Sequence, residues 1–583
     1  MEHLKFKELP AFTSKPLPFS PDETHLQNWL DSLAALPDKI VAEELLQIIT
    51  TIAGLEEQNF LELDLLQQIL QYFHDRVESM QEVYLDLNHS FDERVTYNLE
   101  LVVWNYILLA KSILNIVQKN LLTMSADQQA SGLYLSLDAL NHALLHMSIS
   151  YRSAMPGFWS LSYQVYRLAE KQHLLTSEVN PHGYRSHYSR IHRPINTEQA
   201  FKQLLIFHLA DPQQFNCPDM IMIFKALLPF SLKASIIRGY QPEWQSGTCE
   251  FNLSQDTPPH RILDDELRVD AMERFIAPIA VAKCFYKAIQ EHTLPTTLSV
   301  STPVALRAIN ALGLGRKRKY LRTTPKNSET EFSGLVGFTE LIKHLQFKSS
   351  INIKQPFAND SVSDGKKPAT FDSMALELVP IGEDIGHHLR ASSKKASPQI
   401  TLTPIQRTMM LNQSSEKSND PINSTQVWLN SNKADLHLET FEVKDISIKG
   451  YGLLTNWTTT HAKIGDVLAI VHELEQTVEL GLVRRINHVP VQRLHFGIEI
   501  LSFKAELVYV TNNDNPSINT WAIYMPAIEN LKQPETLLYE HQAFKVASTI
   551  TVLDRHGSRQ YYSKKQLQVT AKLTQMEIQT IVN

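Results

Sequence analysis

Apolar residues recur at steps of three and four through the first 240 residues, which is the spacing of one face of an α-helix. One such stripe consists of Leu66, Ile69, Leu70, Phe73, Val77 and Met80. Further helical runs follow with short connections, and no repeat near 34 residues is evident. Residues 1–240 are therefore predicted to form an all-α helical bundle or solenoid-like interaction domain.

The pattern changes twice after this region. Residues 241–312 predict a mixed segment, with a short β excursion at 247–263 followed by helices. From about residue 434 onward, short runs alternate apolar and polar positions between Gly-containing turns, which is typical of the strands of a small barrel. Segment 511–583 predicts a further β-rich C-terminal extension.

Residues 348–433 show neither periodicity. They are rich in Ser, Asn, Lys, Asp and Pro, and they contain too little apolar surface to offset the entropy of ordering. We expect a largely disordered insertion between the strand-and-helix run that ends near residue 347 and the strands after residue 434.

Composition indicates a soluble, multidomain protein. The 583 residues are 43% apolar and 20% charged, and Cys217, Cys249 and Cys284 show no CxxC spacing. The N-terminus lacks a signal-peptide core, and the apolar run Leu101–Val117 is broken by polar residues and short for a bilayer span. We interpret that run as a buried helix, expect no membrane span, and predict a cytoplasmic location.

Charge is distributed unevenly along the chain. The first hundred residues hold 19 acidic and 6 basic side chains, whereas the net charge of the whole chain is −7, so the remainder carries +6. This balance argues against binding to long nucleic acids, which requires extensive phosphate neutralisation. It remains compatible with a small phosphorylated ligand.

Two short motifs stand out in the second half of the chain. "RKRKYLR" contains Arg318 and Arg322 in the spacing RxxxR, and "VKDISIKGYGLL" contains Asp445, Ser447 and Gly450 in the spacing DxSxxG. Each spacing alone is common, because arginines in loops are usually solvated and Asp, Ser and Gly are ordinary turn residues. Their order is informative: arginines, then a strand, then DxSxxG, then further strands.

In this order and context the motifs resemble the PilZ domain, a bacterial receptor module for cyclic di-GMP. The resemblance implies a multidomain α+β fold in which a helical N-terminal half precedes a PilZ-like six-stranded antiparallel β-barrel and a β-rich tail. The barrel would comprise residues 313–347 and 434–510. It further implies cyclic di-GMP as the ligand, with no other cofactor.

The same resemblance assigns roles to the motif residues, and their chemistry suits the ligand. Arg318 and Arg322 would grip phosphate or guanine, since a guanidinium can bind both and can stack on a base. Asp445 would accept from the guanine N1–H and N2–H₂ groups, Ser447 would add a polar contact, and Gly450 would avoid a clash between a Cβ and the ligand.

One departure from the family concerns spacing, because 122 residues lie between Arg322 and Asp445. The predicted insertion accounts for this distance, since the entropy of closing a loop grows slowly with length. Arg316, Lys317 and Lys319 are possible auxiliary phosphate contacts. Arg484 and Arg485 also fall in the barrel and are interpreted as surface charges.

Three functional hypotheses follow. The first is an effector that binds cyclic di-GMP and passes the signal to unidentified protein partners through the helical region, with an output in motility, pili or biofilm that the family implies. The second is a PilZ-like docking scaffold that has lost nucleotide binding. The third is a helical scaffold for protein clients to which the barrel is merely appended.

Signals for chemistry or metal binding are weak. His142 and His146 are spaced i,i+4 without the Glu of an HExxH motif, and the pattern is interpreted as structural. His182, His187 and His192 lie in an expected loop without a cysteine or carboxylate pattern. With no nucleophile elbow or paired-carboxylate motif, the sequence predicts neither an enzyme nor a metal site.

Overall fold

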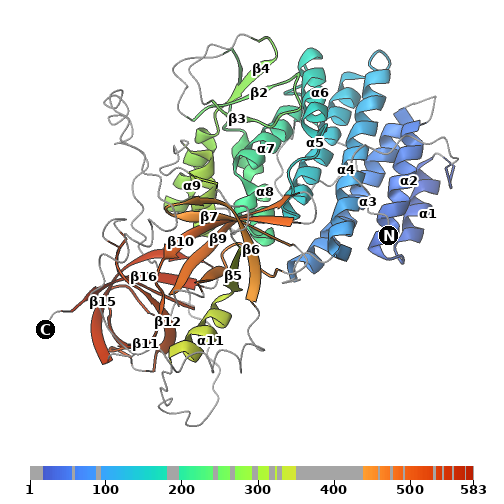
Figure 1. Ribbon diagram of the computed structural model, residues 1–583. Coiled ribbons are helices and arrows are strands. Elements are labelled where there is room, and N and C mark those ends of the chain that lie inside the picture. The colour runs from blue at the N-terminus through green and yellow to red at the C-terminus, as the bar shows by residue number, and fades with distance from the viewer. Residues whose placement is uncertain are drawn as a thin grey trace.

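The computed structural model of the 583-residue chain shows a row of helices followed by two β-barrels (Figure 1). It describes residues 17–20, 22–54, 60–86, 93–179, 196–239, 247–262, 270–291, 300–313, 322–324, 331–349, 438–456, 460–472, 477–489, 493–515, 517–528, 533–540, 544–554, 557–570 and 573–581. The α+β fold class predicted from the sequence is confirmed. The predicted insertion 348–433 lies outside the described residues except for its first two positions, at the end of helix α11.

The helical domain consists of helices that follow one another across the molecule (Figure 1). They are α1 (Glu23–Leu33), α2 (Asp38–Gly54), α3 (Phe60–Asp86), α4 (Glu93–Lys119), α5 (Ala126–Ile149), α6 (Phe158–Lys171), α7 (Thr197–Leu209), the 3₁₀ turn η1 (Pro212–Gln214) and α8 (Cys217–Ser231). Helix α5 begins with a capping box between Ser125 and Gln128, which satisfies two free N–H groups of its first turn.

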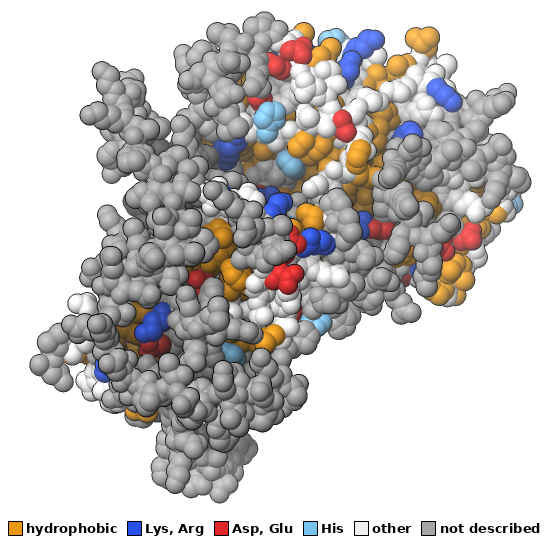
Figure 2. Space-filling view, viewed as in Figure 1, with side chains coloured by type: hydrophobic (Ala, Val, Ile, Leu, Met, Phe, Trp, Pro, Cys, Tyr) orange, Lys and Arg blue, Asp and Glu red, His pale blue; other side chains and the backbone are white. Residues whose placement is uncertain are grey.

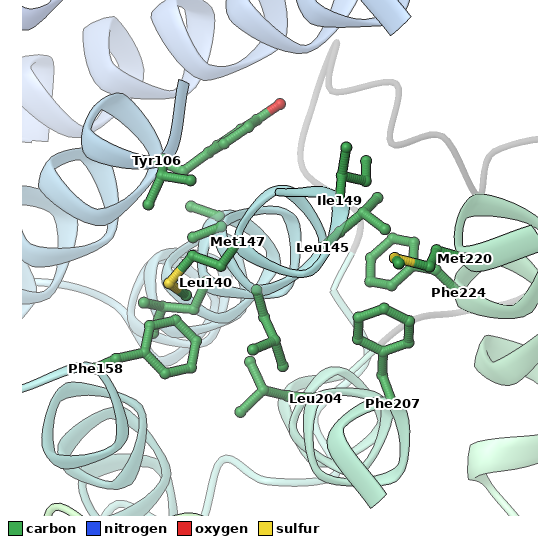
Figure 3. Packing of buried hydrophobic residues seen from close by; sticks show 14 of the residues in the cluster. Tyr106, Leu140, Leu145, Met147, Ile149, Phe158, Leu204, Phe207, Met220 and Phe224 are labelled. Atoms are coloured by element: carbon green, nitrogen blue, oxygen red, sulfur yellow. The ribbon is translucent and has the colours of Figure 1, made fainter. Parts of the chain in front are cut away.

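Helix α5 is the centre of this domain. Its residues from Gln129 to Ile149 are buried with the exception of Ser131, so it contacts neighbours on every side. Figure 3 shows its apolar side chains between Tyr106 of α4, Phe158 of α6, Leu204 of α7 and Phe224 of α8. A helix that is buried on every side has its apolar residues spread around its whole circumference, and its buried polar side chains, such as Asn141, must find partners within the fold.

One helix, Tyr97–Lys119, is long and apolar enough by composition to cross a membrane. It belongs to α4, and 83% of its most apolar window is buried inside the fold. The interpretation of Leu101–Val117 as a buried helix is therefore confirmed, since the core helix of a folded domain meets the same length and composition test.

A small sheet and two helices connect the helical domain to the barrels. Strands β1 (Ile236–Arg238), β2 (Cys249–Asn252), β3 (His260–Arg261) and β4 (Glu273–Ile276) pair in the order β1-β4-β2-β3. Helices α9 (Ile279–Gln290) and α10 (Thr302–Leu312) follow. The expected β excursion and the helices after it are both present.

The first barrel is closed and antiparallel, with the strand order β10-β7-β6-β5-β8-β9. Its strands are β5 (Glu331–Val336), β6 (Leu438–Ser447), β7 (Gly450–Asn456), β8 (Val467–His472), β9 (Thr477–Val489) and β10 (Arg493–Ser502). Helix α11 (Phe338–Ser349) follows β5, as the strand-to-helix pattern predicts. Residues on both sides of the long intervening segment thus build one barrel, because β5 pairs with both β6 and β8.

The β-rich C-terminal extension is a second closed barrel rather than an open tail. Its strands are β11 (Glu506–Asn512), β12 (Asn519–Met525), β13 (Thr536–Glu540), β14 (Thr549–Asp554), β15 (Gly557–Val569) and β16 (Leu573–Thr580), in the order β11-β12-β13-β16-β15-β14. Pairing of β11 with β14 closes it and removes free strand edges. Helix α11 packs into an apolar cluster shared by the two barrels.

The first barrel is docked on the helical domain. One apolar cluster is continuous from α1 to β10 and includes Phe215 near α8 and Ile486 of β9. Polar contacts join the same surfaces: the backbone N–H of His488 donates to the carbonyl of Tyr151 at 2.8 Å, and Arg485 lies 3.1 Å from Asp211. Movement of the barrel would therefore change the contacts made by η1 and the end of α7.

Two histidines at this junction make its stability sensitive to acid. Burial lowers the pKa of His208 and of His488 to about 4, with smaller contributions from the nearby charges of Arg485 and Arg152. Because the folded pKa lies below the ordinary value of 6.5, the unfolded chain binds more protons between about pH 4 and 6.5. Above that window both histidines are neutral in either state and do not affect stability. As the pH falls through it, they are protonated first in the unfolded chain, which lowers the stability of the folded protein.

We therefore expect the double variant His208→Gln/His488→Gln to lose less of its thermal stability than the native chain between pH 6.5 and 4.5. The measurement is the unfolding midpoint at several pH values, and the informative quantity is the difference in slope between the two proteins. His260→Gln, at a half-exposed position of β3, is the control variant. Equal slopes for all three proteins would contradict the prediction.

Candidate functional site

Arg322 and Asp445, which the sequence places in separate motifs, form an ion pair on the first barrel. The Nη1 atom of Arg322 lies 3.0 Å from Oδ1 and 3.2 Å from Oδ2 of Asp445. Two backbone hydrogen bonds between Thr323 and Ile446, of 2.8 and 2.9 Å, hold the arginine segment against β6. Both side chains are partly exposed, at 39% for Arg322 and 18% for Asp445, so the pair can be reached by a ligand.

Asp445 stands at one end of a row that crosses four strands. It pairs with Gly452 on β7, Gly452 pairs with Gly497 on β10, and Gly497 pairs with Arg485 on β9. Residues directly opposite one another in antiparallel strands point to the same face of the sheet. The flanking residues of both glycines are buried in the barrel, so this row faces outward.

The middle of the row therefore has no side chains. We call Gly450, Gly452 and Gly497 the glycine shelf; Gly450 belongs to the neighbouring row, where it pairs with Ser447 and Glu499. The distance from Asp445 to Arg485 is three strand spacings, roughly 14 Å. The backbone there is partly exposed at Gly450 and Gly497, whereas Gly452 is buried beneath the Asp445 carboxylate. A flat group of that order of size could lie against this side of the barrel, between the acidic and basic ends.

A side chain at each of the three shelf glycines would contact a different neighbour. A Cβ on Gly452 would lie 2.6 Å from Oδ2 of Asp445, so this glycine leaves room for the carboxylate. A Cβ on Gly450 would lie 2.3 Å from the carbonyl oxygen of Ile498, whereas one on Gly497 would meet only Cβ of Arg485 at 3.3 Å. Gly450 is thus needed for the approach of β10, in addition to any contact with a ligand.

Gly450→Ala is expected to destabilise the first barrel by about 1–3 kcal/mol, because the clash is with backbone that cannot rotate away. Gly497→Ala serves as the matched variant, since its Cβ has room with only a small adjustment. Denaturant unfolding monitored by intrinsic fluorescence and circular dichroism would compare the two. Equal stability of the variants would show that β10 can shift without cost.

Charges of both signs surround the shelf. Ser447 donates from its Oγ to the carbonyl of Gly450 at 3.2 Å, and Lys444 is exposed beside Asp445. The pKa of His495 on β10 is lowered, first by burial and then by the nearby charge of Lys444, with Arg322 and Arg485 adding to the effect. Figure 2 shows basic and acidic side chains gathered at the middle of the molecule, over the junction of the barrel with the helical domain.

Arg485 connects the shelf to the helical domain. Its Nη2 atom donates to Oε1 of Gln213 at 2.7 Å and lies 3.1 Å from Oδ1 of Asp211. Asp211 has φ +53° and ψ +67°, a left-handed conformation that Asp and Asn tolerate better than most residues. The interpretation of Arg485 as a simple surface charge is therefore wrong, since it is the contact between β9 and η1.

The structure brings together only part of the predicted site. Arg322, Asp445, Ser447 and Gly450 lie around the end of β6 and the start of β7. Arg318, together with the possible auxiliary residues Arg316, Lys317 and Lys319, lies outside the described residues, and its role stays a prediction. Sequence reasoning missed Gly452 and Gly497, for which "GYG" and "HFG" within strand patterns were the available signal.

Comparison with known families gives matches at both ends of the chain. The family described as the N-terminal domain of the cyclic-di-GMP receptor FimW matches residues 24–240, and the FimW C-terminal β-barrel domain matches residues 508–581. These ranges correspond to the helical domain and to the second barrel, with the first barrel between them. No curated protein and no solved structure gives a significant match.

Proposed function

Since the chain belongs to the FimW family of cyclic-di-GMP receptors, we propose that it binds cyclic di-GMP on the outer face of its first barrel and transmits this binding to the helical domain. The observation that carries the proposal is the row from Asp445 across Gly452 and Gly497 to Arg485, with Arg322 paired to its acidic end.

Each part of the row suits one part of the ligand. The carboxylate of Asp445 accepts from the donor edge of a guanine, while the shelf offers a flat surface to the base. Arg322 and Arg485 stand on either side of the shelf, where guanidinium groups can bind the two phosphates or fork onto guanine O6 and N7. Arg318 completes the predicted pair of arginines from the preceding segment.

Asp445 need not release Arg322 to bind guanine. A single nitrogen, Nη1, contacts both carboxylate oxygens, so lone pairs remain on the carboxylate, although its Oδ1 atom is buried in the free protein. The ion pair holds the arginine segment on β6 in the free protein, and the ligand then contacts groups that are already in place. Such preorganisation reduces the ordering cost of binding.

Coupling to the helical domain follows from Arg485. In the free protein this arginine is paired with Asp211 and bonded to Gln213 of η1. A phosphate on the shelf competes with Asp211 for the same guanidinium, so the ligand favours a state in which the junction is loosened. Binding energy is thus used to shift a conformational equilibrium, and no chemistry occurs on the ligand.

We further propose a cytoplasmic receptor whose helical domain presents the surface for protein partners, with an effect on motility, pili or biofilm. Three observations support this part. The helical domain matches the N-terminal domain of a cyclic-di-GMP receptor, and the RxxxR and DxSxxG motifs resemble those of PilZ domains. The cysteines are free, which suits a reducing compartment. The rival proposal is a docking scaffold without nucleotide binding.

Isothermal titration of the full-length protein with cyclic di-GMP tests the proposal, with GTP as the control ligand. The expected result is saturable binding in the micromolar range or tighter for cyclic di-GMP and no comparable binding of GTP. A flat trace from protein that unfolds cooperatively would reject the receptor and support the docking scaffold.

A further inference from the structure

Three side chains that can bind a metal meet in the core of the helical domain. They are His74 of α3 and Asp138 and His142 of α5, and their ligand atoms all lie within 4.8 Å of one another. His74 Nε2 lies 3.2 Å from Oδ2 of Asp138, and the ring centroids of His74 and His142 are 4.3 Å apart. All three residues are buried, with an exposed fraction of 2% or less.

The spacing of one pair of these atoms is close to that of a tetrahedral zinc site, and the remaining spacings are within 4.8 Å. Zinc binds His nitrogen and carboxylate oxygen at about 2.0–2.2 Å, which places neighbouring ligand atoms about 3.3 Å apart. The 3.2 Å between Nε2 of His74 and Oδ2 of Asp138 is already near this value. Asp138 and His142 are four residues apart on one face of α5, so small side-chain rotations would bring the third ligand into place.

Other contacts orient the ligands. The Nδ1 atom of His74 is 2.8 Å from the hydroxyl of Tyr106, which leaves Nε2 directed at Asp138. Metal-binding histidines generally have their second nitrogen held in this way. Tyr106 projects from α4 beside α5 among apolar side chains (Figure 3), and Phe224 packs edge-on against His142.

We propose that His74, Asp138 and His142 bind one Zn²⁺ ion that links α3 to α5 in the helical domain. Two imidazoles and one carboxylate favour zinc over Mg²⁺ or Ca²⁺, which prefer oxygen ligands alone. A water molecule completes the tetrahedron in this proposal. Because the site is closed to solvent, the ion stabilises the fold and has no catalytic role. His142 would then be a ligand, in place of the structural role that its sequence pattern suggested.

Metal analysis of the untagged full-length protein is the first test. After exposure to Zn²⁺ and extensive dialysis we expect about one zinc per chain, an X-ray absorption spectrum with nitrogen and oxygen neighbours at about 2.0 Å, and a thermal midpoint that falls on chelation. Zinc-free protein whose midpoint is unchanged by zinc and by chelator would overturn the proposal and leave a hydrogen-bonded core network.

The chain has 23 histidines, so variants are needed to show which of them bind the zinc. His142→Gln and Asp138→Asn are expected to retain less than about a fifth of the zinc bound by the native protein. His146→Gln is the matched control, because His146 lies one turn further along α5, is fully buried, and stacks on Tyr106. Full zinc content in His142→Gln, or equal loss in His146→Gln, would place the metal elsewhere. If a variant fails to fold, the metal content and absorption spectrum of the native chain still decide the matter.

Discussion

Asp445→Asn is expected to weaken binding of cyclic di-GMP by roughly 10- to 100-fold, which corresponds to the loss of one or two charge-assisted hydrogen bonds. The substitution keeps the shape of the side chain but replaces a carboxylate oxygen by a donor, which faces the donor edge of guanine. It also removes the charge that holds Arg322 at 3.0 Å. Titration calorimetry of the native and variant proteins measures the change.

A second variant separates direct contact from positioning. If Asp445 acts only by holding Arg322, then Arg322→Ala and the double variant should bind equally weakly. If each residue contacts the ligand, their effects on the free energy of binding should add. The proposed geometry favours additivity, because the carboxylate has lone pairs beyond those that face Nη1 of Arg322.

The second barrel offers a matched control for both substitutions. Arg559 and Asp554 form an ion pair of 2.8 Å there, with exposed fractions of 50% and 12% that resemble those of Arg322 and Asp445. Asp554→Asn and Arg559→Ala should leave the affinity unchanged while costing similar small amounts of stability. Equal losses of affinity in the two barrels would show that the shelf is not the binding site.

Sequence patterns predicted those features that depend on neighbouring residues. The stripe from Leu66 to Val77 lies on α3 and is buried, because helical periodicity is local. The strands after residue 434 were likewise evident from alternation. Asp445, Ser447 and Gly450 could be singled out because a strand interior gives no reason for their combination.

The missed features depend on contacts between distant residues. Gly452 and Gly497 form a shelf only through the register of β7 against β10, which no local pattern fixes. Arg485 meets Gln213 across 272 positions, and His74 meets Asp138 across 64. Closure of the second barrel requires β11 to pair with β14, whereas alternation alone indicates strands without stating which edges meet.

Substitutions on the two sides of the barrel–helix junction are expected to change ligand affinity in opposite directions. Arg485→Ala should weaken binding of cyclic di-GMP about tenfold, because it removes one guanidinium from the shelf. Asp211→Asn should strengthen it by roughly two- to tenfold, because the free protein then no longer holds Arg485 in an ion pair. The Asn side chain suits the left-handed backbone at position 211, so the turn is retained.

The opposite signs make this test discriminating. General damage to the fold of the barrel would lower the affinity in both variants, and a shelf that is not the binding site would leave both unchanged. Arg493→Ala is the control, because Arg493 pairs with Glu442 of the same barrel and, among the described residues, makes no hydrogen bond or ion pair with the helical domain. Hydrogen exchange of α7 and η1 should rise with ligand in the native protein, since Asp211 loses its partner. In Asp211→Asn the same amides should exchange faster before ligand is added and respond less to it. Unchanged exchange in the ligand-bound native protein would contradict coupling through Arg485 even where the affinities follow the predicted signs.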